Sequence, residues 1–257
     1  MDKISDKTRL DQLLVRLGLV KSREKARAVI MAGLVQIDGV KLEKPGHMVP
    51  SSATVSIKKK YPPYVSRGGL KLEAALEHFN VDVAGLELLD VGASTGGFTD
   101  CLLQHGAQRV FAVDVGHGQL DWNLRQDPRV VVMEKMNARH LRPEDLDAPL
   151  NGAVIDVSFI SLKLVVPPIS DLLHEESFII ALIKPQFEVG RTLVGKGGVV
   201  RDTKLHTDVI QELAAFFSAN GWKVEGHVAS PILGPKGNRE FLIYLTRKAG
   251  NLHDFTQ

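Results

Sequence analysis

A short apolar segment that runs directly into a glycine-rich turn constrains the fold of this chain most. Residues 88–91, Leu-Leu-Asp-Val, have the character of a buried strand, and residues 92–97 follow as Gly-Ala-Ser-Thr-Gly-Gly. Glycine permits positive φ angles and a close approach of the backbone to another group. In open α/β sheets such a turn lies at the carboxyl end of a strand, which is where ligands bind. The segment therefore predicts an α/β sheet with a ligand site beyond this strand.

Alternating strand and helix patterns surround the turn. Strands are expected at 87–92, 109–114, 130–134, 152–157, 178–184, 222–230 and 239–246, and the clearest helices at 67–79, 97–105 and 203–219. Such alternation indicates a mostly parallel sheet with helices on both faces. Only residues 231–238 separate the last two strands, which is too short for a helical crossover, so these strands should pair antiparallel. The expected fold class is α/β, with a Rossmann-like sheet of seven strands.

Residues 1–60 have the pattern of a separate small domain. Leucines at positions 10, 13, 14 and 17 recur at helical spacing, and Ser22 is a suitable N-cap for a second helix. Residues 35–42 then alternate around an Asp-Gly pair, which indicates a hairpin, and a further strand is expected at 54–57. A lysine- and proline-rich stretch follows. We therefore expect an α+β domain over residues 1–60, a linker over 61–66, and the larger domain over 67–257.

The charge of the chain is unevenly distributed. Residues 1–60 hold 13 Lys and Arg against 6 Asp and Glu, a net charge of +7, whereas the whole chain has +2. Such a basic block suits a polyanionic partner such as RNA, although a solvated surface would have the same composition. Arg23 and Arg27 are four residues apart and share one helix face. Phosphate contacts in this domain are expected from Arg9, Lys21, Arg23, Lys25 and Arg27.

Composition excludes several other classes of protein. The single cysteine, Cys101, rules out a disulfide framework and a cysteine-rich zinc site. The apolar run at 178–183 is far shorter than the ~18 residues that a membrane span needs. The first seven residues are too polar for the core of a signal peptide. A soluble cytoplasmic protein is the expectation.

The spacing of the glycine turn indicates which ligand it binds. A dinucleotide site favours G-x-G-x-x-G, whereas this turn reads G-x-x-x-G-G after Asp90, which suits S-adenosylmethionine better. Asp114 ends the second strand, where a carboxylate can bind ribose hydroxyls, and Asn137 follows the third, where an amide can bind adenine. A purely structural turn is the alternative. The expected cofactor residues are Gly92, Ala93, Ser94, Thr95, Gly96, Gly97, Asp114, Val115, Asn137 and Asp156.

Elimination suggests which kind of atom would accept the methyl group. Cys101 lies on the helix after the glycine turn, so it is unsuited to be the nucleophile that carbon methylation of cytosine uses. Residues 156–159, Asp-Val-Ser-Phe, differ from the Asp-Pro-Pro-Tyr type of motif of amine methylation. A hydroxyl group remains, and a weakly acidic ribose hydroxyl needs a base such as a neutral lysine. Each candidate for this chemistry could also be an ordinary surface charge; the candidates are Lys71, Asp156, Lys184 and Glu240.

These motifs together resemble a known family. The Lys, Asp, Lys, Glu series and the segment 90–99 resemble the FtsJ-like ribose 2′-O-methyltransferases, and residues 8–57 resemble the S-four RNA-binding domain. With the segment 64–72, Tyr-Val-Ser-Arg-Gly-Gly-Leu-Lys-Leu, the chain is similar to the TlyA family. The resemblance implies methylation of cytidine 2′-hydroxyls in ribosomal RNA, with S-adenosylmethionine as cofactor and ribosomal RNA or subunits as partner.

The resemblance also implies roles for particular residues. Lys71, Asp156, Lys184 and Glu240 would be catalytic, and Arg67 would join the RNA-binding residues. Lys184 is expected to be the general base, with Asp156 and Glu240 holding the lysines and the ribose. No metal is expected, because the sulfonium leaving group already carries the positive charge that it loses. Members of this family are often named haemolysins, so a pore-forming protein and a non-catalytic RNA-binding protein are the alternatives.

Overall fold

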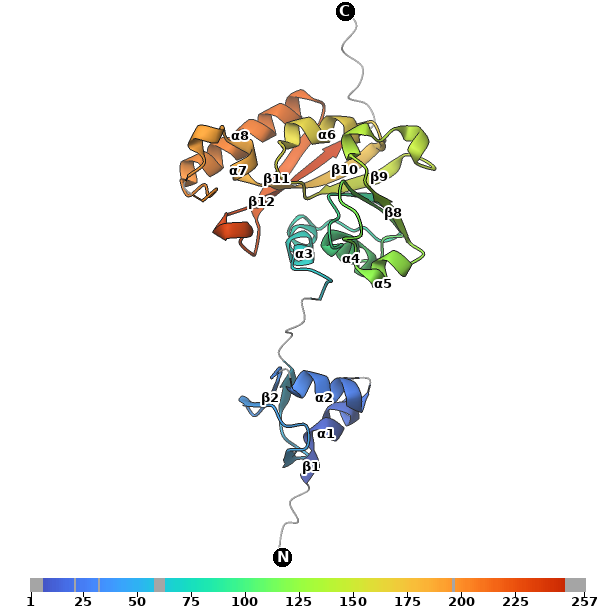
Figure 1. Ribbon diagram of the computed structural model, residues 1–257, viewed down its shortest axis with the longest axis vertical. Coiled ribbons are helices and arrows are strands. Elements are labelled where there is room, and N and C mark those ends of the chain that lie inside the picture. The colour runs from blue at the N-terminus through green and yellow to red at the C-terminus, as the bar shows by residue number, and fades with distance from the viewer. Residues whose placement is uncertain (1–6, 21, 32, 58–62, 196, 248–257) are drawn as a thin grey trace, which may run out of the picture. The chain divides into compact units, whose positions relative to one another are not determined.

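The computed structural model describes residues 7–20, 22–31, 33–57, 63–195 and 197–247 (Figure 1). The chain divides into two compact units, Met1–Pro62 and Pro63–Gln257. Each unit has a hydrophobic core of its own, so each is described by itself.

The first unit is a small α+β domain. Its elements are β1 (Lys7–Arg9), α1 (Leu10–Arg16), α2 (Arg23–Met31), β2 (Val35–Ile37), β3 (Val40–Leu42), β4 (Met48–Pro50) and β5 (Val55–Ile57). The two helices, the hairpin and the strand near residue 55 confirm the sequence predictions. Asp38 and Gly39 both have positive φ angles, 48° and 83°, as a tight hairpin turn requires.

Two details of this unit differ from the prediction. Strands β1 and β4 pair antiparallel but were not predicted, because no tight turn joins them as Asp38-Gly39 joins β2 and β3. Leu17 was expected on the apolar face of the first helix. Instead it forms the C-cap of α1 and is 49% exposed, because the helix ends at Arg16.

The second unit contains the predicted seven-stranded sheet. Its order is β11-β12-β10-β9-β6-β7-β8, and β12 is antiparallel to both of its neighbours, which confirms the prediction for the last two strands. The strands are β6 (Glu87–Val91), β7 (Arg109–Asp114), β8 (Val130–Glu134), β9 (Leu150–Ile155), β10 (Leu173–Ile183), β11 (Lys223–Ala229) and β12 (Phe241–Arg247). The α-helices are α3 (Gly68–Phe79), α4 (Gly97–Gln104), α5 (Trp122–Gln126), α6 (Leu162–Ser170), α7 (Pro185–Glu188) and α8 (Thr203–Ala219).

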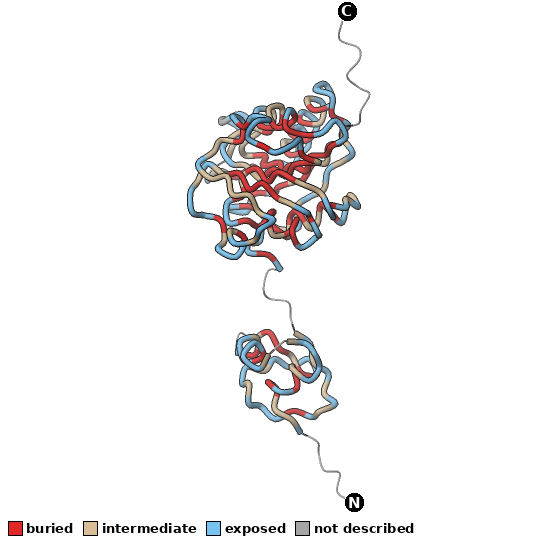
Figure 2. Tube along the Cα trace, turned by 90° about the vertical axis from the view of Figure 1, so that its right-hand side faces the viewer, coloured by how far each residue is buried: buried red, intermediate tan, exposed pale blue. Residues whose placement is uncertain are grey.

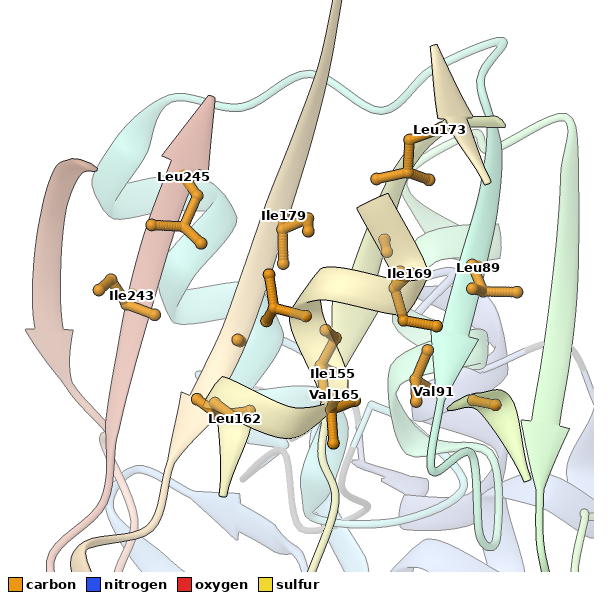
Figure 3. Close-up of a cluster of buried hydrophobic side chains, with 14 of the residues drawn as sticks. Leu89, Val91, Ile155, Leu162, Val165, Ile169, Leu173, Ile179, Ile243 and Leu245 are labelled. Atoms are coloured by element: carbon orange, nitrogen blue, oxygen red, sulfur yellow. The ribbon is translucent and has the colours of Figure 1, made fainter. Parts of the chain in front are cut away.

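Helices cover both faces of this sheet, α6 and α8 on one face and α3, α4 and α5 on the other (Figure 1). Successive strand residues point to opposite faces. Leu89 and Ile155 pack with α6 (Figure 3), whereas Leu88 and Val154 pack with the other helix layer. The buried residues are concentrated in the strands and in the inner helix faces (Figure 2). This arrangement is the expected α/β fold. Because helices cover both faces of the sheet, a ligand site is expected at the strand ends.

Residues 63–66 were expected in a linker but pack on the second unit. Tyr64 is buried, and its hydroxyl donates to Glu73 Oε1 at 2.8 Å. The backbone N–H of Val65 donates to Asp100 Oδ2 at 2.7 Å. The segment is therefore anchored to α3 and α4, while 61–62 and 58–60 lie outside the described residues.

Candidate active site

The glycine turn lies between β6 and α4 and has little room for side chains. Gly92 has φ +85°, and a Cβ atom there would lie 2.5 Å from the carbonyl oxygen of Asp156. The N–H groups of Gly92 and Ala93 both donate to the carbonyl of Val113, at 2.9 and 3.1 Å. The turn is thus fixed against the ends of β7 and β9, which brings the strand ends predicted from the sequence to one place.

A pocket of about 610 Å³ opens beside this turn, at the carboxyl ends of β6, β7 and β9. It is lined by six of the expected cofactor residues: Gly92, Ser94, Asp114, Val115, Asn137 and Asp156. Apolar side chains that include Met136, Ile160 and Val165 form further parts of its wall. Ala93 and Thr95 instead line a smaller, adjoining pocket of about 270 Å³.

Gly96 and Gly97 line neither pocket, although both were expected to contact the cofactor. A Cβ atom on Gly96 would lie 2.3 Å from Leu124 Cδ1, and one on Gly97 would lie 2.2 Å from Ser66 Oγ. The packing of the turn against neighbouring segments therefore accounts for these two glycines.

Two polar side chains in the larger pocket, Asp114 and Asn137, can form hydrogen bonds with a ligand. Asp114 Oδ2 accepts the N–H of Ser94 at 2.8 Å, and its Oδ1 accepts the N–H of Gly116 at 2.7 Å. Each carboxylate oxygen keeps a further lone pair, which can accept a hydroxyl group. The amide oxygen of Asn137 accepts the N–H of Arg139 at 3.1 Å, so its NH₂ group is the part available to a ligand. A carboxylate, an amide and an apolar wall suit a nucleoside.

The four predicted catalytic residues converge beside the glycine turn. Lys71 Nζ donates to Glu240 Oε2 at 2.6 Å and lies 3.9 Å from Asp156 Oδ2. Lys184 Nζ lies 2.5 Å from Asp156 Oδ1. Lys71, Lys184 and Glu240 are 6%, 8% and 2% exposed. We call these four residues the charge cluster; in it each carboxylate contacts a lysine, which offsets the cost of burying charge.

The fold explains why residues so far apart in sequence meet. Asp156 and Lys184 follow the parallel strands β9 and β10, so both lie at the carboxyl edge of the sheet. Glu240 immediately precedes the antiparallel β12, whose first residue lies at that same edge, and α3 supplies Lys71. Lys71, Lys184 and Asp156 line the smaller pocket, and Gly92, Ser94 and Asp156 line both pockets. A ligand in the larger pocket would therefore be adjacent to the buried amines.

The basic residues predicted to bind RNA have different surroundings. In the first unit, Arg9 and Arg23 each contact the buried carboxylate of Asp11 at 3.0 Å, and the Arg9 hydrogen bond contributes most to lowering the pKa of Asp11 to about 2. Lys25 and Arg27 are exposed on α2, whereas Lys21 lies outside the described residues. In the second unit, Arg67 is exposed and lines the smaller pocket.

Sequence reasoning did not select Ser158 and Phe159 as site residues. Both are exposed and line the larger pocket. Phe159 is 89% exposed, has φ +65°, and its ring centroid lies 4.8 Å from that of Phe187. The sequence feature that could have identified them is their position directly after a strand end, next to Asp156.

Asp90, beneath the glycine turn, is also in an unusual environment. It is fully buried, and Thr99 Oγ1 donates to its Oδ2 at 2.6 Å. Burial disfavours the charged form and raises the pKa of Asp90 to about 7. The folded chain should therefore hold a proton on this carboxyl under mildly acidic conditions.

This protonation predicts a pH-dependent effect of Asp90→Asn in the cofactor-free chain. Because the folded pKa of Asp90 is raised, the wild type loses stability as pH rises from about 4 to about 7. Asparagine does not titrate, so the free energy of unfolding of the variant should rise relative to wild type by up to about 1.4 kcal/mol per pH unit. Urea unfolding at pH 5, 6 and 7 measures the difference. A constant difference would mean that the carboxyl is ionised throughout.

Comparison with known proteins identifies the family. A model of the FtsJ-like methyltransferases matches residues 64–247, and a model of the S4 domain matches residues 8–55. A Mycobacterium tuberculosis protein named 16S/23S rRNA (cytidine-2′-O)-methyltransferase TlyA is 46% identical, over 93% of this chain and 90% of that protein. The chain belongs to the TlyA family of FtsJ-like methyltransferases. The family and enzyme class predicted from the motifs are confirmed.

Other relatives of this TlyA-family chain have haemolysin names. Hemolysin A of Brachyspira hyodysenteriae is 41% identical, over 92% of this chain and 98% of the relative. A solved structure from Streptococcus thermophilus, described as a hemolysin, is 44% identical, with a TM-score of 0.72 and coverage of 96% of this chain and 90% of that chain. No helix in the described part of this TlyA-family chain is long and apolar enough to cross a membrane.

Proposed function

We propose that this chain transfers a methyl group from S-adenosylmethionine to the 2′-hydroxyl of a cytidine in ribosomal RNA. The charge cluster carries the proposal, because it places two buried amines beside a nucleoside-sized pocket. Asp114 and Asn137 suit the ribose and the adenine of the cofactor. Support for the RNA substrate comes from the S4 domain and from the name of the Mycobacterium tuberculosis relative.

Each member of the charge cluster has a distinct part in the reaction. The bound cofactor supplies an electrophilic methyl group on a sulfonium. Lys184 is the general base, which takes the proton of the 2′-hydroxyl while the oxygen forms its bond to the methyl carbon. Asp156 holds the Lys184 amine at 2.5 Å, and Glu240 fixes Lys71 at 2.6 Å, so both amines stay directed toward the acceptor. Arg67, at the smaller pocket, is suited to a phosphate of the bound RNA.

Removal of the Asp114 carboxylate tests the cofactor assignment. Asp114→Ala should weaken the binding of adenosylhomocysteine by roughly 1–3 kcal/mol, because buried polar partners lose their acceptor. Titration calorimetry measures this change. Asp208→Ala, on the exposed surface of α8, is a suitable control and should bind like the wild type. Equal binding by Asp114→Ala would remove Asp114 from the site.

The chemistry of the product tests the proposed function. Alkali cleaves RNA through the 2′-hydroxyl, so a 2′-O-methyl group protects the adjoining phosphodiester bond. Ribosomal subunits treated with the chain and S-adenosylmethionine should yield a methylated dinucleotide that resists alkali. A methylated product that alkali degrades to mononucleotides would indicate base methylation and would contradict the proposal.

A further inference from the structure

The hydroxyl of Ser158 lies where the two pockets of the site meet. It follows Asp156 by two residues and lines the larger pocket, while its Oγ accepts a hydrogen bond from Lys184 Nζ at 2.9 Å. Lys184 itself lines the smaller pocket. The Lys184 amine is thus held between Asp156 Oδ1, at 2.5 Å, and Ser158 Oγ.

These two contacts determine the direction of the amine. Nitrogen in a lysine amine is tetrahedral, with one position bonded to Cε and three others. Among the described residues, Ser158 accepts a hydrogen bond from this amine and the Asp156 carboxylate forms an ion pair with it, so we assign one of these positions to each. The last position then remains for the lone pair of the neutral amine. Because Lys184 lines the smaller pocket, this lone pair can take the proton of a ribose hydroxyl bound there.

Asp156 alone would not fix this direction. An ion pair leaves the amine free to exchange its three positions by rotation about the Cε–Nζ bond. The hydrogen bond to Ser158 Oγ, at a fixed place, restricts that rotation. Ser158 is held in turn, because the ring of the next residue, Phe159, contacts that of Phe187, with ring centroids 4.8 Å apart.

We propose that Ser158 is a positioning residue that directs the Lys184 lone pair toward the acceptor hydroxyl. The inference rests on the proposed function. In the step, the 2′-hydroxyl proton passes to Lys184 Nζ, which becomes an ammonium, and the oxygen bonds to the methyl carbon. The methyl–sulfur bond breaks with its electron pair on sulfur, which leaves adenosylhomocysteine. The ammonium donates its three N–H groups to Asp156, Ser158 and the newly formed ether oxygen.

Steady-state kinetics of full-length Ser158→Ala tests this role. We expect kcat to fall about 10-fold or more, because a misdirected base loses orientation rather than reactivity. The KM for RNA and the Kd for adenosylhomocysteine should stay within about twofold of wild type, since Ser158 is assigned to the transfer step. Ser158→Thr keeps the hydroxyl and should recover most of the lost turnover. A structural defect would not be rescued in this hydroxyl-dependent manner.

A matched control lies three residues further along the chain. Ser161 caps α6 and contacts Glu188, away from the charge cluster. Ser161→Ala should lower the melting temperature yet leave kcat near the wild-type value.

Two outcomes would overturn the inference alone: an active wild type with an equally active Ser158→Ala, or a faster Ser158→Ala. A faster variant would mean that the Ser158 hydroxyl donates a hydrogen bond to the lone pair of Lys184 and so blocks proton transfer. A wild-type chain that methylates no 2′-hydroxyl would overturn the proposed function and the inference with it.

Discussion

Replacing Lys184 with alanine should lower the turnover of methyl transfer by about 10²–10⁴, the usual contribution of a positioned base. Lys184 lies 2.5 Å from Asp156 and lines the smaller pocket, so its loss removes the amine that we assign as the base. Binding of adenosylhomocysteine and of RNA should change little, because the Lys184 amine is assigned to proton transfer and not to the binding of either ligand. Single-turnover kinetics, together with calorimetry, separates the two effects.

Lys184→Arg distinguishes a base from a positive charge. Guanidinium keeps its proton near neutral pH, so this variant should be nearly as slow as Lys184→Ala. Lys204→Ala is the matched control, because Lys204 is an exposed lysine on α8 and its loss should leave turnover unchanged. An active Lys184→Arg enzyme would show that the lysine only supplies charge, and the base would have to be another group.

Removal of the first unit should greatly lower the affinity for RNA, which is the second large effect that we expect. Because residues 63–66 pack on α3 and α4, a fragment that begins at Pro63 keeps these contacts, whereas one that begins at Ser66 loses them. With about four phosphate contacts, full-length affinity should fall roughly 10²-fold between 50 and 200 mM salt. The fragment should bind RNA weakly and with a flatter salt dependence, while its turnover at saturating RNA stays close to that of the whole chain.

Methylation at low RNA concentration provides the decisive comparison for this unit. The full chain should be faster than the fragment there, and the two should converge as RNA becomes saturating. Adenosylhomocysteine binding, measured on both, controls for damage to the second unit. If the fragment methylates RNA as well as the full chain at low RNA concentration, the first unit does not supply affinity.

The sheet was predictable from the sequence because most of its strands are apolar runs with clear ends, and β11 alternates polar and apolar residues. The start of β10 was not predictable: the strand begins at Leu173 rather than near 178. Its first part has exposed residues and an irregular register against β9, so it lacks the pattern of a buried strand. Three-residue strands such as β1 and β4 are fixed by pairing across the domain, which no local pattern records.

Three members of the charge cluster were predictable because they lie next to strand ends, and strand direction determines which edge of the sheet each end occupies. The fourth, Lys71, lies on α3, and its role was inferred from the family resemblance. Ser158 and Phe159 were not predictable, since they lie in a loop and the positive φ of Phe159 sets where its ring points. The burial of Asp11 was also missed. An aspartate on a helix is usually solvated, whereas Asp11 pairs with Arg9 in the preceding strand and with Arg23, which the packing of α1 against α2 brings close.

Mapping the methylated nucleotide tests the central claim most directly. Undermethylated ribosomal subunits would be incubated with the chain and S-adenosylmethionine carrying a labelled methyl group, and the labelled nucleotide would be identified by mass spectrometry. The account predicts label on the ribose 2′-oxygen of a cytidine, with the wild type active and Lys184→Ala at least about 10²-fold slower. Label on a base, or no label with correctly folded wild-type chain, would contradict it.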